Sequence, residues 1–146
     1  MATNNTYSQQ EKLKSRKALE GLFAKGQSFS VFPIKVFYTV TNLSAEDNLT
    51  LDPKASLVHA GVGVSARIFK KAHDRNKVKR LLREVYRTQK QPLYQVVAAN
   101  QRTINVFFLY IGKTLPVFAD LQINMAKTLE KLVKKLSEPH QDVQSV

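Results

Sequence analysis

The sequence predicts an α+β domain in which a small sheet of about four strands is packed by helices. Segments with two-residue and with 3.6-residue apolar periodicity follow one another in the order helix, strand, strand, helix, strand, helix. The chain has 146 residues, which fits one domain, and 43% of them are hydrophobic, which is enough for a substantial core. We expect one domain over residues 15–137, with polar tails at 1–14 and 138–146.

The first half of the domain contains one predicted helix and two predicted strands. Ser15 can cap a helix over residues 16–25, and Gly26 ends it. A strand follows over 32–41, a polar loop over 42–54, and a second strand over about 56–65. In the first strand, Ile34, Val36, Tyr38 and Val40 share one face, while Lys35, Phe37 and Thr39 share the other.

The second half begins with a long basic helix from Phe69 or Asp74 to Gln89, for which Asp74 is a suitable N-cap. Residues 93–100 can add another helical turn, and residues 103–111 form a buried strand rich in Val, Phe and Ile. A closing helix over 116–137 ends before Pro139.

The charge balance is strongly basic, with 23 Lys and Arg against 11 Asp and Glu, a net charge of +12. Such an excess attracts polyanions, so nucleic acid is the first partner to consider, an anionic membrane the second and an acidic protein the third. The chain has no cysteine, which fits a reducing cytoplasm. Its polar start, residues 1–10, predicts no signal peptide, and its longest apolar run, 104–111, is too short to span a bilayer. We therefore expect a cytoplasmic protein that does not enter a membrane.

Most of this charge lies in residues 67–90, which contain ten basic and only two acidic residues. The apolar residues of this segment have the spacing of one helix face: Val78, Leu81, Leu82, Val85 and Tyr86. The basic residues Arg75, Lys79, Arg83 and Arg87 lie four apart and predict a row of cations, about 6 Å per step, that can follow successive phosphates. An ordinary solvated helix would interleave acids with the bases. A membrane-surface helix inserts its apolar face into lipid. This segment lies between two predicted strands, where its apolar face is needed for the protein core, so we disfavour that alternative.

The same segment resembles the signature of the bacterial ribonuclease P protein family. The matching residues are Gly61-Val62-Gly63-Val64-Ser65, then Phe69-Lys70-Lys71-Ala72, then the run Asp74 to Arg87. Leu22-Phe23-Ala24-Lys25-Gly26 and Val36-Phe37-Tyr38 are similar to the family's first helix and first strand. Lys77 stands where the Arg-Asn-Arg motif of the family has its second arginine.

The resemblance implies a left-handed crossover between parallel strands, against the usual right-handed rule. It also implies that the chain is a subunit of ribonuclease P, an endoribonuclease in which the RNA is the catalyst and the protein alone is not catalytic. The partners would be the catalytic RNA and precursor tRNA, whose 5′ leader is removed. Magnesium would be used by the RNA, with no cofactor or metal bound by the protein alone, and the protein would be a monomer in the ribonucleoprotein.

The resemblance also assigns two surfaces. The catalytic RNA would be bound by Lys70, Lys71, Arg75, Asn76, Lys77, Lys79, Arg80, Arg83 and Arg87. A cleft between the first helix and the sheet would hold the 5′ leader through Leu19, Phe23, Val36, Tyr38, Ser65, Arg67 and an aromatic residue of the last strand, Tyr110 or Phe108.

Two other functions remain open at this point. A structural RNA-binding protein of the ribosomal type would explain the charge without a leader cleft. An enzyme that cleaves RNA by itself is disfavoured, because His59, His73 and His140 have no ligand spacing and the acids form no close pair except Glu46-Asp47.

Overall fold

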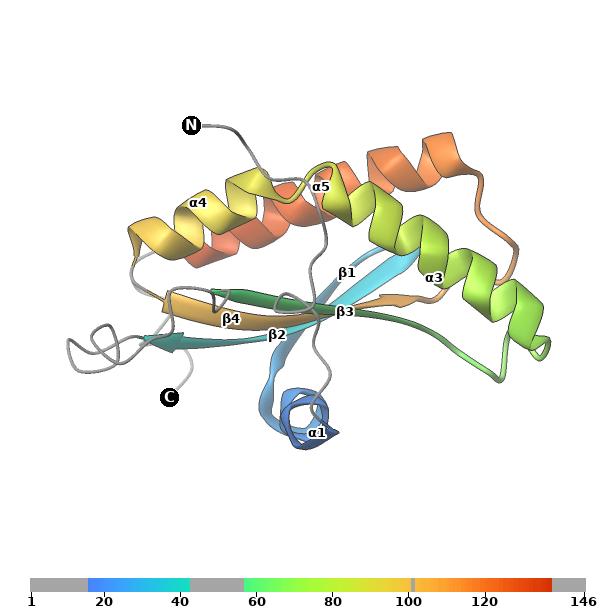
Figure 1. The fold of residues 1–146 in the computed structure, drawn as a ribbon, viewed down its shortest axis with the longest axis horizontal. Coiled ribbons are helices and arrows are strands. Elements are labelled where there is room, and N and C mark those ends of the chain that lie inside the picture. Colours follow the sequence, from blue (N-terminus) through green and yellow to red (C-terminus); the bar gives the residue numbers. More distant parts are fainter. Residues whose placement is uncertain (1–15, 43–56, 101, 138–146) are drawn as a thin grey trace.

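The computed structural model describes residues 16–42, 57–100 and 102–137, which form one mixed sheet with helices on both faces (Figure 1). The elements are α1 (Arg16–Lys25), β1 (Gln27–Val31), β2 (Ile34–Asn42), β3 (Val58–Val64), α3 (Ala72–Arg87), α4 (Gln91–Ala99), β4 (Arg102–Tyr110) and α5 (Phe118–Ser137). Within these ranges, no helix combines the length and apolar character needed to cross a bilayer.

The sheet has the strand order β1-β2-β4-β3. β1 and β2 form an antiparallel hairpin, and β2 also pairs antiparallel with β4. β3 is the other edge strand and runs parallel to β4, with Val58 opposite Ile104 and Val64 opposite Tyr110. Because β3 and β4 are parallel, the chain between them must return along the sheet, and α3 and α4 make that return.

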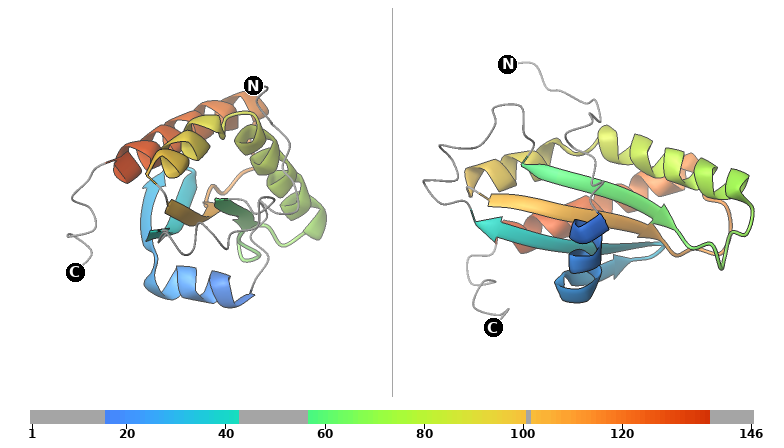
Figure 2. Two further views of the ribbon diagram at one scale, coloured as in Figure 1. Left: turned by 60° about the vertical axis from the view of Figure 1, so that its left-hand side comes forward. Right: turned by 60° about the horizontal axis from the view of Figure 1, so that its bottom comes forward.

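The crossover has the rare left-handed sense that the family resemblance implies. In Figure 1 both strands run in the same direction below α3 and α4, and the second view in Figure 2 shows β3 on the outer side of β4. The basic helix therefore lies over the exposed edge of the sheet, beside β3, rather than over its centre.

The core lies between the sheet and the layer formed by α3, α4 and α5. The strands contribute the alternate residues Ile34, Val36, Tyr38, Val58, Ala60, Ile104, Val106, Phe108 and Tyr110. The helices contribute Val78, Leu82, Val85, Tyr86, Leu93, Val97, Leu121, Met125, Leu129, Leu132 and Leu136. α1 lies on the opposite face of the sheet (Figures 1 and 2), which it contacts through β2 and β4.

The structure confirms all the predicted helices and strands to within a few residues, with two corrections. β1 was not predicted, because its sequence QSFSV is short and largely polar. α3 begins at Ala72, so Asp74 lies in its first turn and not at the N-cap, which is Lys71. Most of the predicted loop and both predicted tails lie outside the described residues.

On the α1 side of the sheet, the side chain of Phe107 in β4 lies directly over Gly63 of β3. A Cβ atom at this position would press on the Cζ atom of Phe107 in β4 and would lie 2.9 Å from its Cε2 atom. Only glycine leaves room for the Phe107 ring to lie over β3. Gly63 therefore determines where this aromatic side chain sits.

We predict that Gly63→Ala lowers the free energy of unfolding by about 1–3 kcal/mol, because the added methyl group must displace the Phe107 ring. The matched control is Gly21→Ala in α1, where a Cβ atom would meet nothing within 4 Å. That change should stabilise the protein by about 0.5–1 kcal/mol through helix propensity. Chemical denaturation measures both, and equal effects of the two substitutions would contradict the prediction.

Candidate nucleic-acid interface

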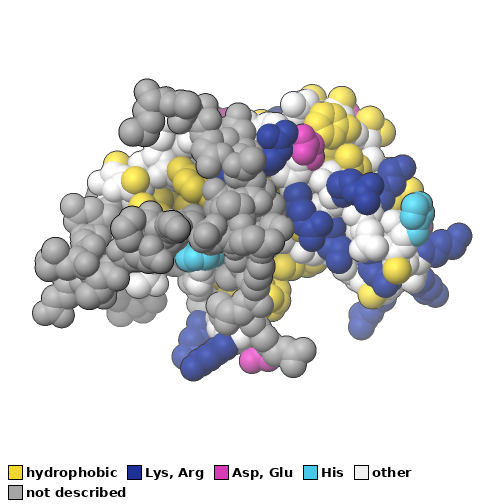
Figure 3. All heavy atoms as spheres, in the orientation of Figure 1, with side chains coloured by type: hydrophobic (Ala, Val, Ile, Leu, Met, Phe, Trp, Pro, Cys, Tyr) yellow, Lys and Arg dark blue, Asp and Glu magenta, His cyan; other side chains and the backbone are white. Residues whose placement is uncertain are grey.

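The orientation of α3 is fixed by its apolar face. Val78, Leu82 and Val85 are completely buried against the sheet and α5, and Tyr86 is 1% exposed. The side chains on the opposite side of the helix must then point into solvent, because residues 3–4 apart share a face. Figure 3 shows Lys and Arg side chains gathered over this part of the molecule, with few acidic groups among them.

The outward face of α3 centres on Arg80. His73, Asn76, Lys77, Arg80 and Arg83 are all exposed. The first four are spaced at i, i+3, i+4 and i+7 and line a surface hollow of about 350 Å³. The sequence interpretation did not assign His73 to this face; its spacing from Asn76 and Arg80 was the available signal.

Arg75 differs from its neighbours because it bonds to the protein itself. Its Nη1 atom donates hydrogen bonds to the carbonyl oxygens of Phe69 and Lys70, both at 2.8 Å. The guanidinium therefore holds the segment that leads into α3 and satisfies carbonyl groups just before the helix. Arg75 acts first as a structural residue, and only its remaining N–H donors are available to a ligand.

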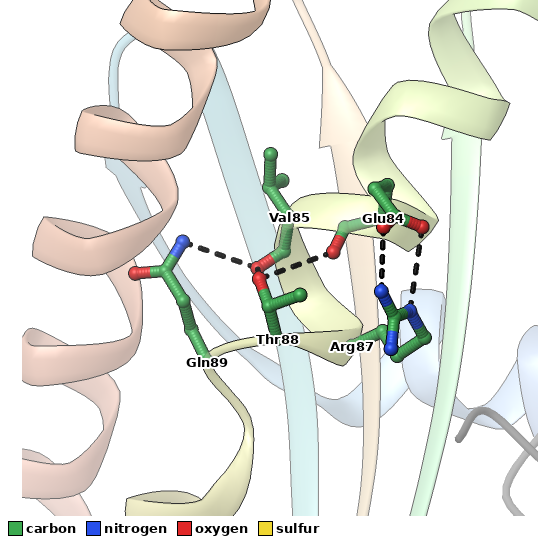
Figure 4. A network of polar contacts seen from close by, with 5 residues as sticks. All are labelled: Glu84, Val85, Arg87, Thr88 and Gln89. Carbon is green, nitrogen blue, oxygen red and sulfur yellow. Dashed lines mark hydrogen bonds and ion pairs between the residues drawn. The ribbon is translucent and has the colours of Figure 1, made fainter. Parts of the chain in front are cut away.

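Arg87 is engaged by an acid at the other end of the helix (Figure 4). Its Nη2 atom lies 2.6 Å from Oε1 of Glu84, and its Nε atom donates to Oε2 at 3.3 Å. The hydrogen bonds from Arg87 lower the pKa of Glu84, so this carboxylate stays charged at neutral pH. Arg87 is therefore partly neutralised, unlike Arg80 and Arg83.

The C-terminal end of α3 is closed by hydrogen bonds to its last carbonyl groups. The Oγ1 atom of Thr88 donates to the carbonyl of Glu84 at 3.3 Å, and the Nε2 atom of Gln89 donates to that of Val85 at 3.1 Å (Figure 4). Gln89 also donates to the carbonyl of Gln122 in α5 at 3.2 Å. The end of α3 is thus attached to α5.

The segment before α3 is a turn that begins at Ser65. The carbonyl of Ser65 accepts from the backbone N–H of Phe69 at 3.0 Å, and its Oγ atom accepts from the N–H of Arg67 at 3.2 Å. Arg67, Lys70 and Lys71 are exposed. Ser65 and Arg67, which were assigned to the leader cleft, therefore adjoin the basic residues that precede α3.

The predicted row of cations at four-residue spacing is not a straight outward ridge. Each step of four residues advances about 40° around the helix axis. Arg75 and Lys79 are accordingly half-buried on the flank, Arg83 is exposed, and Arg87 bonds to Glu84. The fully exposed cations of the predicted set on α3 are Lys77, Arg80 and Arg83, with Asn76 beside them.

The structure does not bring the predicted leader-binding residues together. Leu19 and Phe23 lie on α1, on one side of the sheet, with Phe23 49% exposed. Val36, Tyr38 and Tyr110 are buried on the other side, with exposed fractions of 0%, 3% and 3%. Phe108 lies in the same core. The strand residues expected at the cleft face α3, α4 and α5 because they have the wrong parity for the side that α1 covers.

Two strand residues that do face α1, Phe37 and Phe107, form an aromatic cluster with Phe23 of α1. The ring centroid of Phe23 lies 5.0 Å from that of Phe37 and 5.2 Å from that of Phe107, both in edge-to-face geometry. The Nζ atom of Lys35 lies 5.1 Å from the centre of the Phe37 ring. Aromatic rings beside a cation are the features by which proteins hold single-stranded nucleic acid.

Comparisons with known proteins agree with this architecture. The family model described as Ribonuclease P matches residues 7–136. A ribonuclease P protein component of Porphyromonas gingivalis is 30% identical over 125 residues, covering 86% of this chain and 85% of its own. That of Chlorobium phaeobacteroides is 28% identical over 141 residues, covering 92% and 91%. The solved Staphylococcus aureus RNase P protein has the same fold, with a TM-score of 0.59 at 16% identity over 84% of this chain and 94% of that one. The chain therefore belongs to the ribonuclease P protein family.

Proposed function

We propose that this chain is the protein component of ribonuclease P and binds the catalytic RNA through the outward face of α3. The observation that carries the proposal is the exposed set Asn76, Lys77, Arg80 and Arg83 on a helix whose other face is locked in the core. Arginine and lysine so displayed can contact phosphate oxygens, and arginine can do so with two bonds at once. The similarity to proteins named ribonuclease P protein component supports the choice of this RNA.

We further propose that the aromatic cluster on the α1 side holds the single-stranded 5′ leader of precursor tRNA. Phe23, Phe37 and Phe107 offer partly exposed rings, and Lys35 supplies positive charge next to them. Stacking on such rings tolerates any base, which a leader of variable sequence requires. This assignment replaces Val36, Tyr38 and Tyr110, whose side chains lie in the core.

In this proposal the protein performs no bond cleavage. The catalytic RNA, with its magnesium ions, hydrolyses the phosphodiester, while the protein binds and orients the two RNA molecules. The chemistry of the chain agrees with such a division, because the outward face of α3 offers hydrogen-bond donors and positive charge.

Reconstitution tests the proposal. The purified chain should cleave no RNA by itself, and addition of a cognate catalytic RNA should give 5′ processing of precursor tRNA at a magnesium concentration where the RNA alone is slow. Cleavage by the protein without RNA would exclude the proposal. Equal affinity of the complex for precursor and mature tRNA would favour a structural RNA-binding protein instead.

We predict that Arg80→Ala and Arg83→Ala each weaken binding of the catalytic RNA and lower the salt dependence of that binding. Each lost phosphate contact should reduce the slope of log K against log salt by about 0.7 to 0.9. Thermal unfolding should change little, because both side chains are exposed. Filter binding at several salt concentrations measures the slope.

Arg75→Ala provides the matched comparison. It should lower stability by about 1–3 kcal/mol, because it leaves the carbonyls of Phe69 and Lys70 without their charged donor. If Arg75→Ala left stability unchanged, or if Arg80→Ala reduced stability as much, the division into structural and RNA-facing arginines would be wrong.

We predict that Phe107→Leu reduces the preference of the holoenzyme for precursor over mature tRNA by about 1–3 kcal/mol, the value of one stacked base. Affinity for mature tRNA should stay the same. Competition binding between the two tRNA forms measures the difference.

Tyr38→Phe is the control from the opposite face of the sheet. It removes the hydroxyl group that donates to Oε1 of Gln27 at 2.8 Å but keeps the ring. The preference for precursor tRNA should not change. A lost preference in Tyr38→Phe, together with a normal preference in Phe107→Leu, would place the leader away from the α1 side.

A further inference from the structure

A second basic surface lies on α5, where the helix passes over the edge strand β1. Its lysine side chains surround a hollow of about 570 Å³, which Val31 and Glu130 also line. The lysines are Lys127, Lys131, Lys134 and Lys135, and we name this group the α5 lysine surface.

The charges of this surface are little compensated. Lys127, Lys131 and Lys135 are spaced four residues apart, a spacing at which like charges repel and destabilise a helix. Among the described residues, Glu130 is the one acid that lines the hollow, and no ion pair within 4 Å joins it to any of the four lysines. An arrangement with this repulsion is suited to a bound anion.

Phe29 of β1 places two of the four cations. The Nζ atoms of Lys131 and Lys135 lie 5.2 and 5.6 Å from the centre of the Phe29 ring, within the range of cation–π attraction. The ring itself is held by Tyr38, whose centroid is 6.0 Å away. Two ammonium groups are thus positioned over one ring before any ligand binds, which lowers the entropic cost of binding.

The α5 lysine surface is separate from the interface on α3. α3 packs beside β3, at one edge of the sheet, whereas the lysines of α5 lie over β1, at the other edge. The apolar side of α5 is already in the core through Leu121, Met125, Leu129, Leu132 and Leu136. The exposed large apolar residues of α5, Phe118 and Ile123, precede its lysines, and from Lys127 to Ser137 no large apolar side chain is exposed. This part of the helix therefore has no apolar face to insert into a lipid bilayer, and a hydrophilic polyanion fits the surface better.

We propose that the α5 lysine surface binds the phosphate backbone of RNA, as a second contact independent of α3. The inference rests on the proposed function in one respect: it takes the polyanion to be an RNA of the ribonuclease P complex. Catalytic RNA and precursor tRNA share this chemistry, and the experiment separates them. With basic surfaces at both edges of the sheet, bound RNA would contact the protein on two sides.

The test compares Lys131→Gln/Lys135→Gln with the wild-type chain in two assays: binding of catalytic RNA alone, and binding of precursor tRNA by the assembled holoenzyme. We expect the slope of log K against log salt to fall by about 1.4 to 1.8 in one assay, which identifies the RNA that occupies the surface. Lys127→Gln/Lys134→Gln, at exposed positions away from Phe29, should act in the same direction. Glu130→Gln should tighten binding in the same assay.

The matched control is Lys17→Gln/Lys113→Gln, which removes two exposed positive charges from other parts of the molecule. An unchanged slope in both assays for both lysine pairs, or an equal change in the control, would overturn the inference. The inference would also be overturned if the two lysine-pair variants lost binding to phosphatidylglycerol vesicles while their RNA binding stayed unchanged. Failure of the wild-type complex to process precursor tRNA would instead contradict the proposed function, whatever the lysine variants do.

Discussion

Packing of the apolar stripe of α3 is the constraint on which the rest of the molecule depends. Val78, Leu82 and Val85 are fully buried, so the helix cannot rotate without exposing them to water. A buried side chain of this size contributes roughly 1.5–3 kcal/mol to the free energy of folding. The direction in which Arg80 and Arg83 point is therefore fixed by the core and not by the cations themselves.

The ends of α3 use charge differently from its middle. Arg75 bonds to backbone carbonyls before the helix, and Arg87 bonds to Glu84 in the last turn. These contacts hold the termini, where helices otherwise fray. The exposed cations between them, Lys77 to Arg83, have no such internal bonds among the contacts of the described residues. One continuous basic segment thus divides into structural ends and an open central face.

The sequence alone was sufficient for most of the elements, the buried stripe of α3 and the exposure of Lys77, Arg80 and Arg83 on its other side, because these follow from local periodicity. It was not sufficient to decide which strand residues face α1. The alternation of side chains along β2 places Phe37 and Tyr38 on opposite faces of the sheet, but it does not reveal which face α1 covers. The path of the chain from α1 through Gly26 and β1 decides which face that is. β1 itself is too short and polar to be recognised. The left-handed crossover contradicts the general rule, so only the family resemblance could have predicted it.

The central place of β4 in the sheet has a consequence for how the chain matures. β4 joins the β1–β2 hairpin to β3, yet it follows both in the sequence, and 37 residues separate the end of β3 at Val64 from the start of β4 at Arg102. While the chain is being synthesised, the hairpin and the β3–α3 unit have no strand between them until Tyr110 has left the ribosome. Long-range pairing of this kind is slow, since a large loop must close before any contact forms. A nascent chain that ends before β4 would carry the cations of α3 on a helix without a completed sheet beneath it.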